Sequence, residues 1–230
     1  MIDINVYASG SSGNCYVLSN DHSSIMLDCG LPLREIKEKL NFNLPRAVLV
    51  THEHQDHAKA VKDLIKLGID CYMTEGTAKE LGVSGHRIKI IQAKQMLDIC
   101  GFKVSIFDTQ HDAAEPVGFI VEDDDDKVLY ATDTYYIKYN FIGLTKIMVE
   151  CNHSYEILNK KIKSGELNSR FSKRLLKSHF SLENLKEFLK ANDLSKVKEI
   201  YLIHLSNGNA DEKLFEKEIA MCTGLPVFVV

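Results

Sequence analysis

Residues 51–57 read Thr51-His52-Glu53-His54-Gln55-Asp56-His57 and directly follow the apolar run Ala47-Val48-Leu49-Val50. The apolar run predicts a β-strand, and alternate residues at its end, His52 and His54, would lie on one side. The turn that follows would direct the last two residues of the stretch towards a second point nearby. Neutral imidazoles and carboxylates together suit zinc and neighbouring divalent ions. A solvated polar loop is the alternative, but it leaves matching residues further along the chain unexplained.

Three more polar residues follow predicted strands. His111 comes after the strand 102–107, Asp133 after 127–131 and His204 after 197–203. Loops at strand ends are the usual place for functional side chains to converge. Singly, each residue has an ordinary alternative, either a hydrogen-bonded loop histidine or a turn-forming aspartate. Together with the first stretch they make five histidines and two aspartates, enough for two metal ions with Asp133 able to bridge. The candidate ligands are His52, His54, Asp56, His57, His111, Asp133 and His204.

Length and composition predict a globular chain. The 230 residues are 45% hydrophobic and 26% charged, which is sufficient for a full core and shows no signature of disorder. We find no linker rich in proline, glycine or serine, and no repeat, so we expect a single domain over residues 1–230. The net charge of −4 lacks the strongly basic balance typical of tight non-specific nucleic-acid binding. That argues against a DNA-coating protein, but it leaves room for an enzyme with a local basic groove.

The chain carries no sign of export or membrane insertion. Residues 1–5 lack the basic and apolar regions of a secretory signal, and no apolar run approaches the ~20 residues that a membrane span needs. The six cysteines are widely spread without a C-x-x-C pair, so we expect them to be mostly reduced. We therefore expect a cytoplasmic protein without a membrane partner. Its oligomeric state stays open.

Strands and helices are expected to alternate along the chain. Strands are predicted near residues 2–7, 15–18, 25–27, 46–50, 71–73, 88–91, 102–107, 117–121, 127–131, 145–149, 197–203 and 227–230. Helices are predicted after Pro32, over 61–67, at 75–81, in pieces over 154–190 with the last starting at Ser181, and at 210–221. This order implies sheets covered by helices. The acidic run 122–126 reads as a solvated hairpin turn, with a cation site as the alternative.

The motif H-x-H-x-D-H, followed by a later His, an Asp and a final His, resembles the metallo-β-lactamase superfamily. Leu27-Asp28-Cys29-Gly30 resembles its first motif, and the resemblance extends over nearly the whole chain. It implies an α/β fold, a four-layer αβ/βα sandwich of two mixed sheets flanked by helices. It also implies that His52, His54 and His111 hold one metal and that Asp56, His57 and His204 hold another, with Asp133 between them. The cofactor would be two divalent ions, zinc or manganese.

Subgroup motifs favour a phosphodiesterase. Phosphodiesterase members pair a Glu in an E-[AC]-[TN] motif with a later His-x-Ser/Thr, and this chain has Glu150-Cys151-Asn152 and His179-Phe180-Ser181. The chain most resembles the single-domain YycJ/WalJ-type exonucleases, through residues 8–15, 111–118, 173–177 and 202–206. Tyr135 and Phe180 depart from the residues usual at their positions, and these departures bear on substrate fit.

The resemblance implies a 5′→3′ DNA exonuclease in which two metals generate a bridging hydroxide. Asp28 is expected to orient the 51–57 loop. His179 is the candidate general acid and Glu150 its orienting partner, the alternative being a histidine beside a helix start. Asp56 counts with these residues as catalytic.

Substrate contacts are expected in two places. Residues 159–177 carry Lys173, Arg174 and five further basic residues against one acid, which predicts a stripe that follows phosphates, or alternatively a solvated helix face. The Ser9–Asn14 loop, with Ser11 and Asn14, offers groups to a phosphate, or is a tight turn. His153 is either a substrate contact or a surface loop residue.

The sequence therefore predicts a dinuclear metal-dependent phosphodiester hydrolase, with DNA as the substrate. A small-molecule hydrolase of the same fold, acting on a cyclic phosphodiester or a thioester, is the first alternative. The compact acidic chain favours that alternative, whereas the basic segment favours the nuclease. A non-catalytic binding module ranks last, because its sign would be missing ligands and all seven are present.

Overall fold

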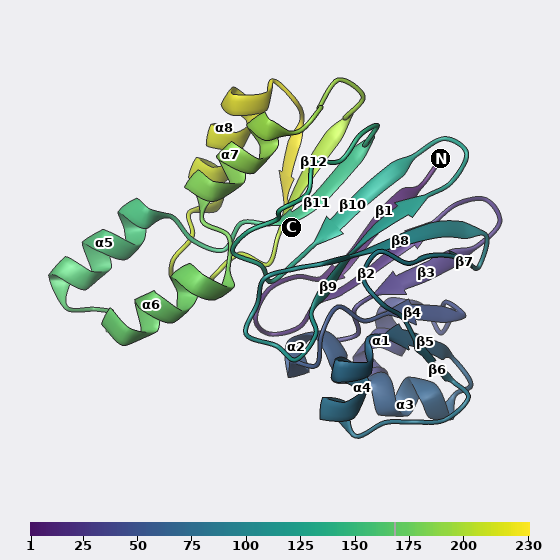
Figure 1. The fold of residues 1–230 in the computed structure, drawn as a ribbon. Coiled ribbons are helices and arrows are strands. Elements are labelled where there is room, and N and C mark those ends of the chain that lie inside the picture. Colours follow the sequence, from purple (N-terminus) through teal and green to yellow (C-terminus); the bar gives the residue numbers. More distant parts are fainter. Residues whose placement is uncertain (168) are drawn as a thin grey trace. The chain divides into compact units, whose positions relative to one another are not determined.

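The computed structural model describes residues 1–167 and 169–230, with the side chains of all of these except 169–172. The chain divides into two compact units, and Figure 1 labels their helices and strands. Unit 1 comprises Met1–Asp108 with Ala113–Asp126, and unit 2 comprises Thr109–Asp112 with Lys127–Val230. The expectation of a single domain over residues 1–230 stays a prediction.

Unit 1 is built on a six-stranded sheet. Its spatial order is β1 (Asp3–Ala8), β2 (Cys15–Ser19), β3 (Ser24–Leu27), β4 (Ala47–Leu49), β5 (Asp70–Met73) and β6 (Ile88–Ile90). The first three strands are antiparallel neighbours, whereas β3 to β6 are parallel. Because β3 and β4 run in the same direction, the polar residues that follow them leave the same edge of the sheet.

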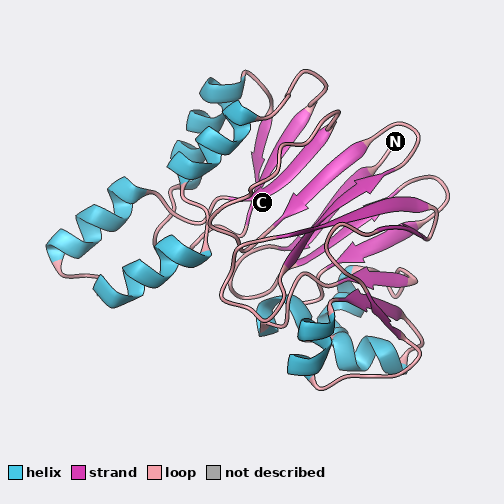
Figure 2. Cartoon of the chain, in the orientation of Figure 1, coloured by secondary structure: helices cyan, strands magenta, loops and turns pink. Residues whose placement is uncertain are grey.

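Four helices accompany this sheet, and Figure 2 draws helices in cyan and strands in magenta. They are α1 (Leu33–Lys39), α2 (Gln55–Ala58), α3 (Val61–Lys66) and α4 (Glu75–Leu81). Apolar residues at helical spacing face inward: Ile36 of α1 and Val61 and Leu64 of α3 are fully buried in the core with β2 to β5. Helix α2 was not expected, because its four residues are too few to show a hydrophobic period.

Three further strands complete unit 1. The strands β7 (Met96–Ile99), β8 (Phe102–Asp108) and β9 (Val117–Glu122) pair antiparallel. β7 was not predicted, since only the last of its four residues is buried and the run shows little apolar alternation.

The acidic run after β9 forms the expected turn. The carboxylate of Asp123 accepts the backbone N–H groups of Asp125 and Asp126 at 3.0 and 2.7 Å. Only part of this run is solvated, because Asp126 is buried and accepts the backbone N–H of Ile2 at 2.9 Å. The expected solvated turn is therefore present at Asp124 and Asp125, whereas Asp126 is part of the interior.

Unit 2 contains four parallel strands. They are β10 (Lys127–Ala131), β11 (Lys146–Glu150), β12 (Glu199–Ile203) and β13 (Val227–Val229), each paired to the next. All five residues of β11 are buried, as expected of a parallel strand covered on both faces. The carboxyl ends of β10, β11 and β12 share one edge, and Asp133, Glu150 and His204 come from that edge.

Helices α7 (Leu182–Ala191) and α8 (Glu212–Thr223) lie beside these strands, while α5 (Tyr155–Ser164) and α6 (Ser169–Ser178) form a separate pair (Figure 1). The side chains of Ser154, Ser181 and Asp211 cap α5, α7 and α8 by accepting a backbone N–H in the first turn. In residues 1–167 and 169–230, no helix has the length and apolarity required to cross a membrane.

The strands of the chain form two mixed sheets flanked by helices. This confirms the α/β class expected from the motif pattern.

Candidate functional site

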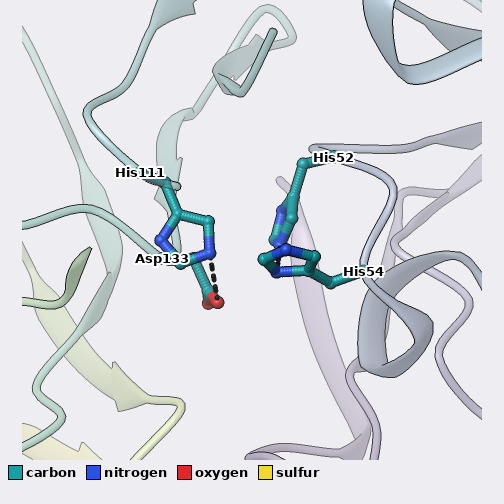
Figure 3. A group of neighbouring side chains, drawn as sticks. All are labelled: His52, His54, His111 and Asp133. Carbon is teal, nitrogen blue, oxygen red and sulfur yellow. Dashed lines mark hydrogen bonds and ion pairs between the residues drawn. The ribbon is translucent and has the colours of Figure 1, made fainter. Parts of the chain in front are cut away.

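The 51–57 segment begins at the end of β4 and runs into α2. His54 is the residue before the helix, and its carbonyl accepts the backbone N–H groups of His57 and Ala58, both at 2.9 Å. One helical turn, instead of the expected loop, therefore carries Asp56 and His57. His52 and His57 are buried, and their rings lie 4.3 Å apart. Nε2 of His52 lies 3.0 Å from Nδ1 of His54, and Figure 3 draws the two side chains next to each other.

Asp28 holds this segment in place. It follows β3, has a positive φ of 54° and is fully buried. Its Oδ1 accepts the backbone N–H of Thr51 at 2.8 Å and the Thr51 hydroxyl at 3.0 Å, and its Oδ2 lies 2.8 Å from Nδ1 of His57. Since a carboxylate oxygen accepts, Nδ1 of His57 carries the proton and Nε2 has the lone pair. These contacts are the ones that an orienting residue makes, and Thr51 joins the set as a residue that the sequence did not point out.

Asn14 and Gly30 pack against the backbone of α2 at Asp56. The carbonyl of Asp56 accepts the backbone N–H of Asn14 at 2.7 Å and its side-chain amide at 3.1 Å. A Cβ on Gly30 would lie 1.7 Å from that carbonyl oxygen, so only glycine fits here. Asn14 is fully buried, so it has no surface that a substrate can reach, whereas Ser11 is exposed.

In unit 2, His111 is held by the end of α6. Its Nδ1 donates to the backbone carbonyl of Ser178 at 2.9 Å, and its Nε2 lies 3.5 Å from Oδ2 of Asp133, the contact dashed in Figure 3. Burial lowers the pKa of His111, although the carboxylate of Asp133 acts in the opposite direction. The ring is therefore neutral at neutral pH and has a lone pair on Nε2.

Glu150, at the end of β11, contacts two histidines and two backbone N–H groups of unit 2. Its Oε1 lies 2.5 Å from Nδ1 of His179 and 3.1 Å from Nδ1 of His204. Its Oε2 accepts the backbone N–H groups of Thr134 and Phe180 at 3.0 and 3.2 Å. One fully buried carboxylate thus fixes both histidines and the chain segments beside them.

Burial opposes ionisation of both Glu150 and His179, but their mutual attraction prevails. The pKa of His179 is raised and the pKa of Glu150 is lowered, because the carboxylate and the imidazolium lie in contact. The pair therefore favours a protonated His179 beside an ionised Glu150.

Two ligand candidates of unit 2 lie in left-handed backbone conformations. Asp133 has a φ of 42° and His204 a φ of 52°, values that are uncommon for residues other than glycine. Such conformations cluster at functional sites, where the surrounding structure enforces them. Asp133, Glu150, His179 and His204 each offer a ligand atom, and these four atoms lie within 4.8 Å of one another.

The remaining predicted contacts in unit 2 differ in exposure. Lys173 and Arg174 are exposed on α6, and Nε of Arg174 donates to Asp112 at 2.8 Å. His153 is fully buried, and neither of its ring nitrogens has a hydrogen-bond partner within the part of the chain that the structure describes. Burial lowers its pKa to about 4 even though Glu150 is nearby. The side chain of Arg170, part of the basic stretch, lies outside the described residues.

The donor set fits divalent metal ions. Histidines that bind a metal usually donate their other ring N–H to a protein oxygen, which orients the ring. That arrangement is present at four of the candidate ligands: Nδ1 of His52 lies 3.0 Å from the Thr51 hydroxyl, and the Nδ1 atoms of His57, His111 and His204 face Asp28, the Ser178 carbonyl and Glu150. The Nε2 atoms and the carboxylates of Asp56 and Asp133 are ligand types suited to zinc, manganese or iron.

Two mixed sheets and clusters of imidazoles and carboxylates are features that metal-dependent hydrolases have. Residues 24–205 match the family model described as a β-lactamase superfamily domain. The chain belongs to this superfamily and has the metallo-β-lactamase fold.

The chain is similar over most of its length to two bacterial exodeoxyribonucleases and to one solved structure. The chain is 30% identical over 228 residues to exodeoxyribonuclease WalJ of Streptococcus pneumoniae serotype 2 (strain D39 / NCTC 7466), covering 91% of this chain and 83% of the relative. It is 29% identical over 239 residues to exodeoxyribonuclease YycJ of Bacillus anthracis, covering 95% and 88%. The fold is similar to the metallo-β-lactamase fold protein YhfI of Bacillus subtilis, with a TM-score of 0.76, 16% identity and coverage of 100% and 96%.

Proposed function

We propose that this chain, a metal-dependent hydrolase of the β-lactamase superfamily, is a DNA exonuclease that cleaves phosphodiester bonds. The observation that carries the proposal is the Glu150–His179 pair, in which a buried carboxylate 2.5 Å from Nδ1 orients an imidazole that can donate a proton. The names of the two exodeoxyribonuclease relatives support DNA as the substrate. Cleavage in the 5′→3′ direction is part of the proposal and comes from the family resemblance.

The proposed cofactor is two divalent ions, zinc or manganese. We assign His52, His54 and His111 to one ion and Asp56, His57 and His204 to the other, with Asp133 shared. When bound, such ions supply a hydroxide nucleophile at neutral pH and neutralise the charge that develops on the phosphate. The protein contributes ring orientation, through Asp28 at His57 and the Ser178 carbonyl at His111.

We assign His179 the role of general acid, which donates a proton to the leaving oxygen. Glu150 occupies Nδ1, so the proton for transfer is on Nε2. Contact with the Glu150 carboxylate raises the pKa of this imidazole despite its burial, which favours the protonated form that a general acid needs. Without the proton, the leaving group would depart as an alkoxide at much higher cost.

The proposed substrate contacts are Ser11, Lys173 and Arg174, which are exposed. Arg174 would exchange its ion pair with Asp112 for a phosphate. Asn14 and His153 have no exposed surface, so their assignment to substrate requires local movement.

A small-molecule hydrolase, acting on a cyclic phosphodiester or a thioester, is the second candidate. The net charge of −4 favours it, as do the ion pairs of Arg174 with Asp112 and Lys160 with Glu156. These pairs reduce the positive charge available to a nucleic-acid backbone.

The test is incubation of end-labelled duplex DNA, single-stranded DNA and RNA with the protein and Mn²⁺ or Zn²⁺. We expect DNA products released from one end, and a His179→Ala variant about 10²- to 10⁴-fold slower at an unchanged metal content. His86→Ala, at an exposed histidine, is the matched control and should retain full rate.

Cleavage of a cyclic phosphodiester or a thioester without cleavage of DNA would select the second candidate. Loss of metal in His179→Ala would instead make this histidine a ligand, as its position in the four-residue cluster also permits.

A further inference from the structure

Unit 2 contains a hollow of about 390 Å³ that the chemistry described above does not use. Its walls are the segment 135–140, which follows Asp133, and residues of α7 with Phe180, which follows His179. The lining is mainly aromatic and apolar, and it includes Tyr135, Tyr136, Phe180, Asn184 and Phe188. Both walls thus continue directly from residues of the candidate site.

Glu150 anchors the two walls at their roots. The same Oε2 atom accepts the backbone N–H of Thr134 at 3.0 Å and that of Phe180 at 3.2 Å. The hydroxyl of Thr134 then donates to the carbonyl of Tyr136 at 2.8 Å, which extends the connection into the wall. Because the other oxygen of Glu150 lies against His179, one carboxylate positions both the candidate general acid and the hollow.

Aromatic rings line the hollow, two of them buried and one exposed. Phe180 and Phe188 are buried, with ring centroids 6.0 Å apart, so they form a fixed apolar floor. Tyr136 is 56% exposed and lines the opening, so its ring is accessible to a ligand. Aromatic side chains on a positioned surface are the usual platforms for stacking of unpaired bases.

Polar groups at the rim match the edge of a base. Asn184 lines the hollow, and its amide Nδ2 lies 3.5 Å from the Tyr135 carbonyl, a long contact that leaves a donor available for exchange. Lys138 adds a positive charge at the same rim. The volume is within the range of small-ligand pockets.

We propose that this hollow binds a nucleobase of the strand next to the phosphate being cleaved, with the base stacked on Tyr136. The inference rests on the proposed function and deepens it, because it names the part of the nucleic acid that the enzyme recognises. It assigns Tyr135 and Phe180 to the walls of the base site.

The test uses end-labelled oligonucleotides that carry a single abasic residue at successive positions from the cleaved end. We expect one abasic position to slow wild-type cleavage, measured as kcat/KM, by about 5- to 150-fold, the range that loss of one stacked base represents. Tyr136→Ala should slow cleavage of the intact strand by a similar factor. On the strand with the sensitive abasic residue, Tyr136→Ala should slow cleavage little further, because the nucleobase that stacks on Tyr136 is already missing.

Two control variants accompany this combination of protein variant and abasic strand. Tyr136→Phe keeps the ring and should behave as wild type, whereas Phe42→Ala removes a 74% exposed ring of unit 1 and should leave cleavage unchanged. Equal slowing by Tyr136→Ala on intact and abasic strands, or no position sensitive to base removal, would overturn the proposal.

Failure of the proposed function gives a different result. If wild-type protein cleaves no DNA, binding of thymidine 5′-monophosphate is measured by calorimetry on wild type and Tyr136→Ala. Binding that the variant weakens by the same factor supports the base site, and equal or absent binding refutes it.

Discussion

His153 shows what burial does to a single titratable residue. The ring is fully buried, has no hydrogen-bond partner among the described residues and has a pKa lowered to about 4 by burial. Unfolding returns the pKa towards 6.5, so the unfolded chain binds the proton more tightly. Stability contributed by the neutral ring is complete above about pH 6.5 and is lost as pH falls towards 4.

We expect wild type to lose on the order of 2 kcal/mol of unfolding free energy between about pH 7 and pH 5 through His153. Urea denaturation at the two pH values measures this loss. A His153→Gln variant should lack this component, while His86→Gln, at an exposed histidine, should retain it. An identical pH dependence in wild type and His153→Gln would show that the buried ring does not titrate this way.

Helix α2 depends on a close approach of two backbones. A Cβ at position 30 would lie 1.7 Å from the carbonyl oxygen of Asp56, and that oxygen also accepts the backbone N–H of Asn14 at 2.7 Å. We expect Gly30→Ala to push α2 away from its support and to destabilise the fold by about 1–3 kcal/mol or more, as overpacking does. Because Asp56 and His57 move with the helix, metal affinity should fall by about 10- to 100-fold.

The matched control for Gly30→Ala is Gly208→Ala. Among the described residues, a Cβ at position 208 meets Nζ of a flexible lysine, Lys161, at 3.5 Å, which is an ordinary contact. Metal titration by calorimetry and urea denaturation check both effects. Wild-type metal affinity in Gly30→Ala would separate α2 from the metal-binding role assigned to it.

At the scale of the whole molecule, metal binding should stabilise the folded chain. An ion present at about 100 times its dissociation constant adds about 2.7 kcal/mol to the folded state. For a chain of this size that corresponds to a rise in Tm of about 5–10 °C. Thermal unfolding with Mn²⁺ or Zn²⁺ and with a chelator measures the difference.

Asp133→Ala is the informative variant for this experiment, because Asp133 is assigned to both ions. Its Tm should respond to metal much less than that of wild type, while Asp124→Ala, in the acidic turn after β9, should respond fully. A wild-type Tm that is independent of metal would contradict metal binding by the folded protein.

Much of the fold was readable from the sequence because its signals are local. The strand predicted at 127–131 followed from an apolar run, and the start of the last helix of the 154–190 stretch followed from Ser181 as a capping residue. α2 and β7 were not readable, because four residues cannot establish a period and tertiary contacts decide their conformation.

The sequence by itself determined the candidate ligands, because histidine and aspartate are recognisable as metal-ligand types and the motif spacing places them after strands. Only the tertiary structure decided how those side chains are oriented. The backbone carbonyl of Ser178 that holds His111 and the backbone N–H groups that hold Glu150 are common to every residue type, so no sequence signal marks them. The hollow beyond Glu150 has the same cause, since its walls meet only when segments more than 40 residues apart are brought together by one carboxylate.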